Sequence, residues 1–208
     1  MPKRTKLFLD TEFTGLHQDT SLISIGIVSE DGRKFYAERA DKRLNLDVDT
    51  AKFLSDNVFP QMSSLYANPE RHHDTSLPIN QVIADFHRIY DTCVLPEYYK
   101  PFQRIGDTHL QSALTNWLTG FGCNVEVWVD VGSWDWVLFC EIFGGARNLP
   151  GNVYYIPFDI STRMEMRGMD PDQSRHELLD KPADYPRHNA LFDAMLLREL
   201  YEYLEAKG

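Results

Sequence analysis

The chain has 208 residues, of which 43% are hydrophobic and 25% are charged. These values are typical of one compact globular domain, so we expect a single domain over residues 1–208. The formal net charge of −10 argues against binding of nucleic acid through bulk positive charge. It does not exclude an enzyme that grips one strand end, because bound metal ions would reverse the local field that a phosphate meets.

The cysteines indicate the compartment. Cys93, Cys123 and Cys140 are far apart and odd in number, which disfavours both a disulfide framework and a zinc site. The apolar run after the basic N-terminus is interrupted at Asp10, so it is not a signal peptide. No apolar run is long enough to span a membrane. We therefore predict a cytoplasmic protein without membrane association.

The first part of the chain predicts three strands and one helix. The strands are expected at residues 6–12, 21–29 and 34–38. The second and third are joined by Asp31-Gly32, a strong hairpin signal. A helix is expected over residues 49–58, ending before Pro60, and residues 61–76 are expected to form a surface loop.

Helices alternate with short strands in the remainder of the chain. The helices are expected at residues 76–91, 107–121, 133–143, 159–167 and 189–205. The strands are expected at residues 125–129 and 153–157. A β-meander followed by this alternation predicts an α/β fold, with a mixed central β-sheet flanked by α-helices.

Two carboxylates lie in the first predicted strand. Asp10 and Glu12 are two residues apart and so point to the same face of the strand. Amid apolar neighbours they would repel each other and lose solvation, and a divalent cation is the simplest compensation. The alternative is that both charges lie on the solvent side of an edge strand.

Two further sites carry candidate functional residues. Asp135 follows an apolar strand and opens a helix, and His188 precedes Asp193 by five residues at the start of the last helix. Taken alone, Asp135 could be a first-turn charge favoured by the helix dipole. Taken alone, His188 could be a capping or surface residue.

Together these residues resemble a known family. The segments Asp10-x-Glu12, Asp135 and His188-x4-Asp193 match, in order, the three motifs of the DEDD exonucleases of the histidine subclass, DEDDh. The resemblance extends from residue 7 to about residue 200. The layout is most similar to that of the small bacterial 3′-5′ exoribonucleases typified by a mycobacterial enzyme.

The second motif departs from the family pattern. Val131 stands where many members carry Asn, four residues before the aspartate, whereas the aromatic residue before it is present as Trp134. Asp130 is a competing candidate for the metal-binding role. We favour Asp135, because a side chain in the first turn of this helix points toward the ends of the neighbouring strands.

The resemblance implies an RNase-H-like sheet and a two-metal reaction. Two Mg²⁺ or Mn²⁺ ions would be held by Asp10, Glu12, Asp135 and Asp193, and would stabilise the attacking and leaving oxygens. His188 would act as the general base, a role that its ordinary pKa suits. The enzyme would release nucleoside 5′-monophosphates from 3′ ends.

Substrate-binding residues are expected around the first and second motifs. They are Thr11, Phe13, Thr14, Gly15, Leu16 and Trp134. Gly15 would allow close approach of the backbone, and by family analogy Leu16 would wedge against the terminal base. Trp134 would stack on a base, with core packing as an equal alternative. The expected partners are 3′ ends of RNA or DNA, single-stranded or overhanging, and a homodimer is one candidate assembly.

Two other functions remain open. Asp10-x-Glu12-x-Thr14 also resembles the nucleophile loop of haloacid-dehalogenase-like phosphatases, although these normally carry aspartate at the second position. That alternative leaves His188 without a role. The other alternative is a nuclease-like fold retained only for binding, which a mutated motif residue would have favoured.

Overall fold

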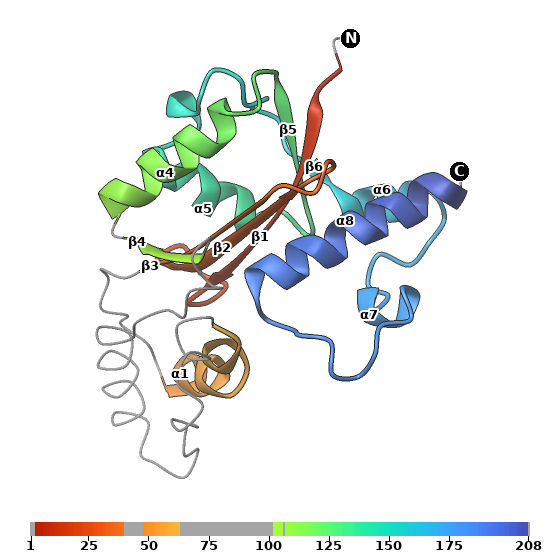
Figure 1. Cartoon of the computed structure of the whole chain (residues 1–208). Coiled ribbons are helices and arrows are strands. Elements are labelled where there is room, and N and C mark those ends of the chain that lie inside the picture. The colour runs from red at the N-terminus through yellow and green to blue at the C-terminus, as the bar shows by residue number, and fades with distance from the viewer. Residues whose placement is uncertain (1–2, 40–47, 63–101, 106, 208) are drawn as a thin grey trace.

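The computed structural model of the chain describes residues 3–39, 48–62, 102–105 and 107–207. Its centre is a mixed sheet, in which the described strands have the order β4-β3-β2-β1-β5-β6 (Figure 1). The strands are β1 (Thr5–Phe13), β2 (Leu22–Ser29), β3 (Lys34–Arg39), β4 (Phe102–Ile105), β5 (Val125–Val129) and β6 (Phe158–Asp159). The first three form an antiparallel meander, and the others pair in parallel with their neighbours. The predicted fold class is confirmed.

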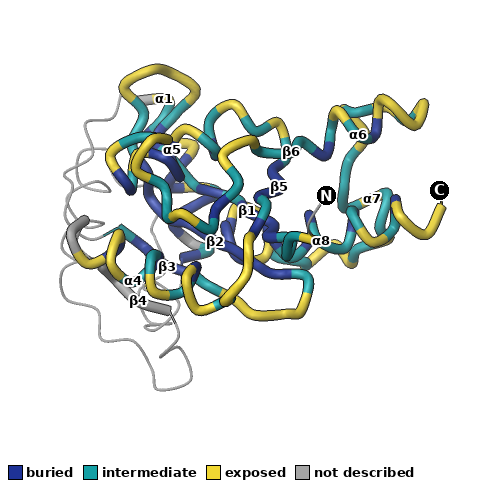
Figure 2. The backbone as a smooth tube through the Cα atoms, turned by 90° about the horizontal axis from the view of Figure 1, so that it is seen from above, coloured by how far each residue is buried: buried dark blue, intermediate teal, exposed yellow. Residues whose placement is uncertain are grey.

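Helices cover both faces of the sheet (Figure 1). One face packs against α4 (Asp107–Thr119) and α5 (Asp135–Ile142). The other packs against α6 (Ile160–Met166) and α8 (Ala190–Lys207). Figure 2 shows that the strands between them are mostly buried, whereas the connecting turns are exposed.

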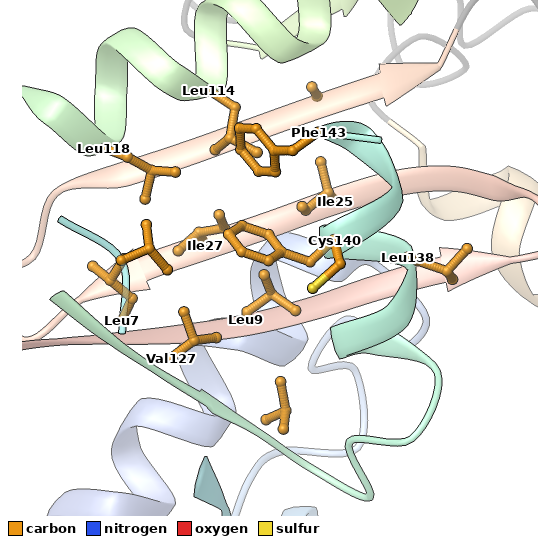
Figure 3. Close-up of a cluster of buried hydrophobic side chains, with 14 of the residues drawn as sticks. Leu7, Leu9, Ile25, Ile27, Leu114, Leu118, Val127, Leu138, Cys140 and Phe143 are labelled. Atoms are coloured by element: carbon orange, nitrogen blue, oxygen red, sulfur yellow. The ribbon is translucent and has the colours of Figure 1, made fainter. Parts of the chain in front are cut away.

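The alternation of β1 decides which side chains meet which helices. Leu7 and Leu9 join the larger hydrophobic core, between the sheet and the pair α4 and α5 (Figure 3). Phe8 belongs instead to the core under α6 and α8. Because side chains alternate along a strand, Asp10 and Glu12 share the face of Phe8 and point toward α8.

Gly26 in the middle of β2 allows α8 to approach the sheet. A Cβ atom at this position would lie 2.2 Å from the carbonyl carbon and oxygen of Ala190 and 2.4 Å from the nitrogen of Leu191. Gly26 is also the cross-strand partner of Asp10. A glycine within a strand often marks such close backbone approach, and here it brings the first turn of α8 against the strand next to Asp10.

The predicted helix over residues 49–58 is confirmed in position but wrong in its end. It begins as α1 (Val48–Phe53), widens into a π-helical turn (Leu54–Val58) and continues as a 3₁₀ turn (Phe59–Gln61). Pro60 lies in the first residues of that last turn, where its missing N–H is not needed. Most of the predicted loop 61–76 and the predicted helix 76–91 lie outside the described residues.

The predicted strand over residues 153–157 is wrong. Val153 makes only an isolated bridge to Val125, and the strand that pairs with β5 is β6, one residue further on. Tyr155 and Ile156 are exposed, and Pro157 has no N–H to donate to a sheet ladder. Three short described elements were not predicted at all, namely β4, the 3₁₀ turn Ala146–Asn148 and α7 (Arg175–Leu178).

A search of the described helices for a membrane-spanning segment is negative, since none combines the length and the apolar character that crossing a bilayer requires.

We expect Gly26→Ala to lower the free energy of unfolding by about 1–3 kcal/mol, because the added methyl group collides with main-chain atoms of α8. For a chain of this size the Tm should fall by about 2–10 °C, measured by thermal unfolding. Gly151→Ala is the matched control, since its Cβ would meet nothing within 4 Å. Equal Tm values for the two variants would contradict this account of the helix contact.

Candidate active site

Three predicted carboxylates converge where β1 meets α8. Asp10 and Glu12 come from β1, and Asp193 comes from the first turn of α8. One carboxylate oxygen from each lies within 4.8 Å of the others. Asp193 is held in place because its Oδ2 accepts a hydrogen bond from the Asn189 nitrogen at 3.1 Å. The structure thus brings together residues from the first and third motifs.

Asp135 lies on the other side of β1 and is not one of the three residues whose oxygens lie within 4.8 Å of one another, although, after burial, repulsion from it helps to raise the pKa values of Asp10 and Glu12. It opens α5 and is buried, and its Oδ1 accepts hydrogen bonds from the Thr11 nitrogen at 3.0 Å and from Thr11 Oγ1 at 2.5 Å. Both bonds go to one oxygen, which leaves Oδ2 available for another partner. Thr11 is itself buried, so the structure gives it a different part from the expected substrate contact: it orients Asp135.

Asp130, the competing candidate, is already paired. Both of its carboxylate oxygens accept hydrogen bonds from Arg175, and Oδ1 also accepts one from Ser161. A carboxylate so engaged is a poorer metal ligand than one with a free oxygen.

Burial disfavours the charged forms of these four acids, and repulsion within the group adds to this at Asp10 and Glu12. Burial, followed by repulsion from neighbouring carboxylates, raises the pKa values of Asp10 and Glu12 well above their ordinary values. Burial raises the pKa of Asp193 to about 7. Burial also raises the pKa of Asp135 to about 6, against the lowering effect of the Thr11 hydrogen bonds.

These oxygens form the donor set that a divalent cation prefers. Hard oxygen ligands suit Mg²⁺ and Mn²⁺, and a cation would relieve the repulsion that raises these pKa values. The acidic cluster therefore indicates the use of a divalent metal.

His188 lies just before α8, in a strained conformation. Its φ of +56° is in the left-handed region, which is uncommon for residues other than glycine. The imidazole packs edge-on against Phe53 of α1, with 5.5 Å between ring centroids. Burial and then the charge of Arg187 lower the pKa of His188, which keeps the ring neutral and able to accept a proton. Phe53 is a neighbour that sequence reasoning missed.

The expected substrate residues differ in how far they are exposed to a ligand. Thr14 is buried, and its Oγ1 accepts a hydrogen bond from the Ser21 nitrogen at 2.8 Å, so it stabilises the turn after β1. Leu16 is 75% exposed at this turn and free to meet a ligand. The rings of Phe13 and Trp134 lie 6.5 Å apart and are partly buried. Leu16 and this aromatic pair remain available for substrate.

A cavity of about 340 Å³ adjoins the carboxylates. Its lining residues are Asp10, Asp130, Asp193, Leu196, Leu197 and residues 172–176. The last of these segments leads into α7, which sequence reasoning missed. Ser174 and Glu177 form the sequence signal of a capping box, and Ser174 Oγ does accept a hydrogen bond from the Glu177 nitrogen.

Removing one clustered carboxylate should stabilise the metal-free protein. Folding raises the pKa values of these acids, so the folded state binds more protons than the unfolded state, and stability falls as the pH rises from about 4 to about 7. In EDTA we expect Asp10→Asn to have a higher Tm than the wild type, with a gap that widens from about pH 5 to about pH 8.

The matched control for this experiment is Glu141→Gln, which removes an exposed negative charge on α5. It should leave the Tm nearly unchanged throughout this range. A gap between Asp10→Asn and wild type that stays constant with pH would show that repulsion at Asp10 does not govern stability.

Comparison with known proteins places this arrangement in a family. The sequence matches the 3′-5′ exoribonuclease Rv2179c-like domain over residues 5–204. The curated 3′-5′ exoribonuclease Rv2179c of Mycobacterium tuberculosis (strain ATCC 25618 / H37Rv) is 27% identical over 192 residues, which cover 91% of this chain and 86% of the relative.

Two solved structures share the fold at low sequence identity. The nuclease domain of 3′hExo, a DEDDh family member bound to rAMP, matches with a TM-score of 0.54 and 14% identity, over 98% of this chain and 92% of that one. S. pombe Pop2p, in its Mg²⁺- and Mn²⁺-bound form, matches with a TM-score of 0.55 and 11% identity, over 97% of this chain and 83% of that one. The predicted resemblance and enzyme class are thus confirmed, and the chain belongs to the family of the 3′-5′ exoribonuclease Rv2179c-like domain.

Proposed function

We propose that this protein is a two-metal-dependent 3′→5′ exonuclease that releases nucleoside 5′-monophosphates from single-stranded or overhanging 3′ ends. The observation that carries the proposal is the convergence of Asp10, Glu12 and Asp193, whose oxygens lie within 4.8 Å of one another. The exoribonuclease family and the mycobacterial exoribonuclease to which this chain is similar favour RNA as the substrate.

Two divalent cations, Mg²⁺ or Mn²⁺, would be held by Asp10, Glu12, Asp135 and Asp193. When bound, such ions stabilise the charges that develop on the attacking and leaving oxygens of a phosphodiester. The protein's own part is to fix the ligands. Asn189 anchors Asp193 and Thr11 anchors Asp135, which reduces the reorganisation needed at the moment of reaction.

His188 would accept a proton from the attacking water at one of its ring nitrogens. Its lowered pKa keeps a nitrogen lone pair available near neutral pH. It precedes α8 and lies outside the regular helix, while Asp193 is anchored within it. A base at this position can adjust to the substrate without moving the carboxylate ligand.

The 3′-terminal nucleotide would lie against Leu16, Phe13 and Trp134. Leu16 exposes an apolar side chain at the turn after β1, next to the carboxylates of the same strand. Aromatic rings stack on any base, which suits an enzyme that removes successive nucleotides regardless of sequence. Gly15 would leave room there for the backbone of the strand end.

We further propose that the chain folds as a single domain over residues 1–208, acts in the cytoplasm and assembles as a homodimer. Among the described cysteines, Cys123 and Cys140 are free, in keeping with a reducing compartment. Membership of an exoribonuclease family disfavours a phosphatase and an inactive binding module.

The polarity of degradation tests the proposed function. With Mg²⁺ or Mn²⁺, a 5′-labelled single-stranded RNA should shorten in single-nucleotide steps, whereas circular RNA and RNA with a 3′-phosphate should resist. EDTA and Asp10→Asn should each abolish the reaction. Parallel DNA substrates measure the sugar preference on denaturing gels. Rapid cutting of the circle would identify an endonuclease, and full activity in EDTA would refute the metal requirement.

Substitution of His188 tests its proposed role as the general base. His188→Ala should lower kcat by roughly 10²–10⁴-fold, as loss of a general base typically does. Affinity for Mn²⁺ should change little, because His188 is not a ligand in this proposal. His109→Ala on the exposed side of α4 is the control. If Mn²⁺ binding collapses in His188→Ala while the pH profile keeps its shape, the assigned role is wrong.

A further inference from the structure

A fifth carboxylate lies close to the four proposed ligands. Strands β1 and β5 pair in parallel with Phe8 opposite Trp128, and Asp10 and Asp130 each follow these residues by two positions. Asp130 therefore lies at the level of Asp10 on the neighbouring chain segment. Repulsion from Asp130 is one of the causes that raise the pKa of Asp10. A fifth acid in this position could compete for a cation.

Arg175 binds this fifth carboxylate, that of Asp130, through two parallel hydrogen bonds. Its Nε donates to Asp130 Oδ2 and its Nη2 donates to Asp130 Oδ1, both at 2.8 Å. Ser161 completes the contact by donating to Oδ1 at 2.5 Å. Two parallel charge-assisted bonds match the planar fork of a guanidinium, and Lys could not reproduce them.

The same guanidinium also fixes the cavity wall. Nη1 donates to the carbonyl oxygens of Pro171 and Gln173, each at 2.6 Å, and Nη2 donates to Ser161 Oγ. All five N–H groups of Arg175 are thus engaged within the protein. Only 14% of its side chain is exposed, so water screens the pair with Asp130 weakly. Its position is determined by the fold and does not depend on a ligand.

The turn beyond Asp130 leads directly to a proposed metal ligand. Val131 has a φ of +49°, a strained value for a β-branched residue, and the next nitrogen, that of Gly132, donates to Asp159 Oδ2 at 3.0 Å. Asp159 also caps α6, because its Oδ1 accepts a hydrogen bond from the Thr162 nitrogen. Contacts on both sides of Val131 therefore hold the turn that ends at Asp135.

We propose that Arg175 is a positioning residue that keeps Asp130 out of the metal-binding set and so leaves Asp135 as the ligand from this segment. The inference rests on the proposed function, because it concerns the same metal site. Without Arg175, Asp130 would present free oxygens on the side of Asp10 and would be as suitable a hard donor as Asp135. A cation that moved toward Asp130 would move away from Asp135, the carboxylate that Thr11 orients.

The test measures Mn²⁺ binding without substrate, by isothermal titration calorimetry. Arg175→Met removes a positive charge and frees a negative one, so Mn²⁺ should bind about three- to tenfold more tightly, while kcat on RNA falls. Adding Asp130→Asn to Arg175→Met should return Mn²⁺ affinity to within about twofold of wild type, since the pair is then removed without net change in charge. Arg167→Met, whose guanidinium contacts Glu205 and the Leu204 carbonyl instead, should bind Mn²⁺ as wild type does.

If Arg175→Met does not fold, the inference can still be tested by comparing Mn²⁺ binding to two other single variants. Asp130→Asn keeps the shape of the side chain and should weaken Mn²⁺ binding no more than about threefold, whereas Asp193→Asn should weaken it by at least about tenfold. Equal losses in these two variants would make Asp130 a ligand and overturn the inference. Unchanged affinity in folded Arg175→Met, or tight binding that persists after Asp130→Asn is added, would also overturn it.

These results separate the inference from the proposed function. A wild-type protein that neither binds Mn²⁺ nor degrades RNA would refute the proposed function and the inference together. A wild-type protein that does both, combined with unchanged Mn²⁺ affinity in Arg175→Met, would refute the inference alone.

Discussion

The close approach of α8 to β2 at Gly26 is the constraint on which the site depends. Main-chain atoms of Ala190 occupy the space that any larger residue at position 26 would fill. Since Gly26 is the cross-strand partner of Asp10, the contact that seats the helix also sets the position of Asp193 relative to β1. Packing and chemistry are therefore coupled, and the helix cannot move away from the sheet without opening the carboxylate cluster.

The cluster created by this contact is unfavourable on its own. Burial and repulsion raise the pKa values of Asp10 and Glu12, and in the absence of a cation they lower the stability of the folded state. The surrounding residues determine which oxygens remain available. Thr11 takes one oxygen of Asp135, and Arg175 takes both oxygens of Asp130. The result is a site in which hydrogen bonds, as well as the presence of acids, select the ligands.

Sequence reasoning succeeded where a signal is local. The first strand and the last helix were predicted at residues 6–12 and 189–205, and the geometry of a strand placed Asp10 and Glu12 on one face. It failed at β4 and over residues 153–157, because a short strand exists only through its pairing with a distant segment. Gly26 carried a usable signal, namely a glycine inside an apolar strand, but only the position of α8 explains it.

The order and residue types of Asp10, Glu12, Asp135, His188 and Asp193 are a property of the sequence itself, and their spacing matched them to the three motifs of the DEDDh family that the chain resembles. The tertiary structure decided what their neighbours do. Thr11, expected to meet substrate, orients Asp135 because its strand position points it away from Asp10. The sequence favoured Asp135 over Asp130 from the position of Asp135 in the first turn of a helix, but it carried no sign of what binds Asp130. Arg175, 45 residues away, binds the Asp130 carboxylate, because a hydrogen bond depends on distance in space and not along the chain.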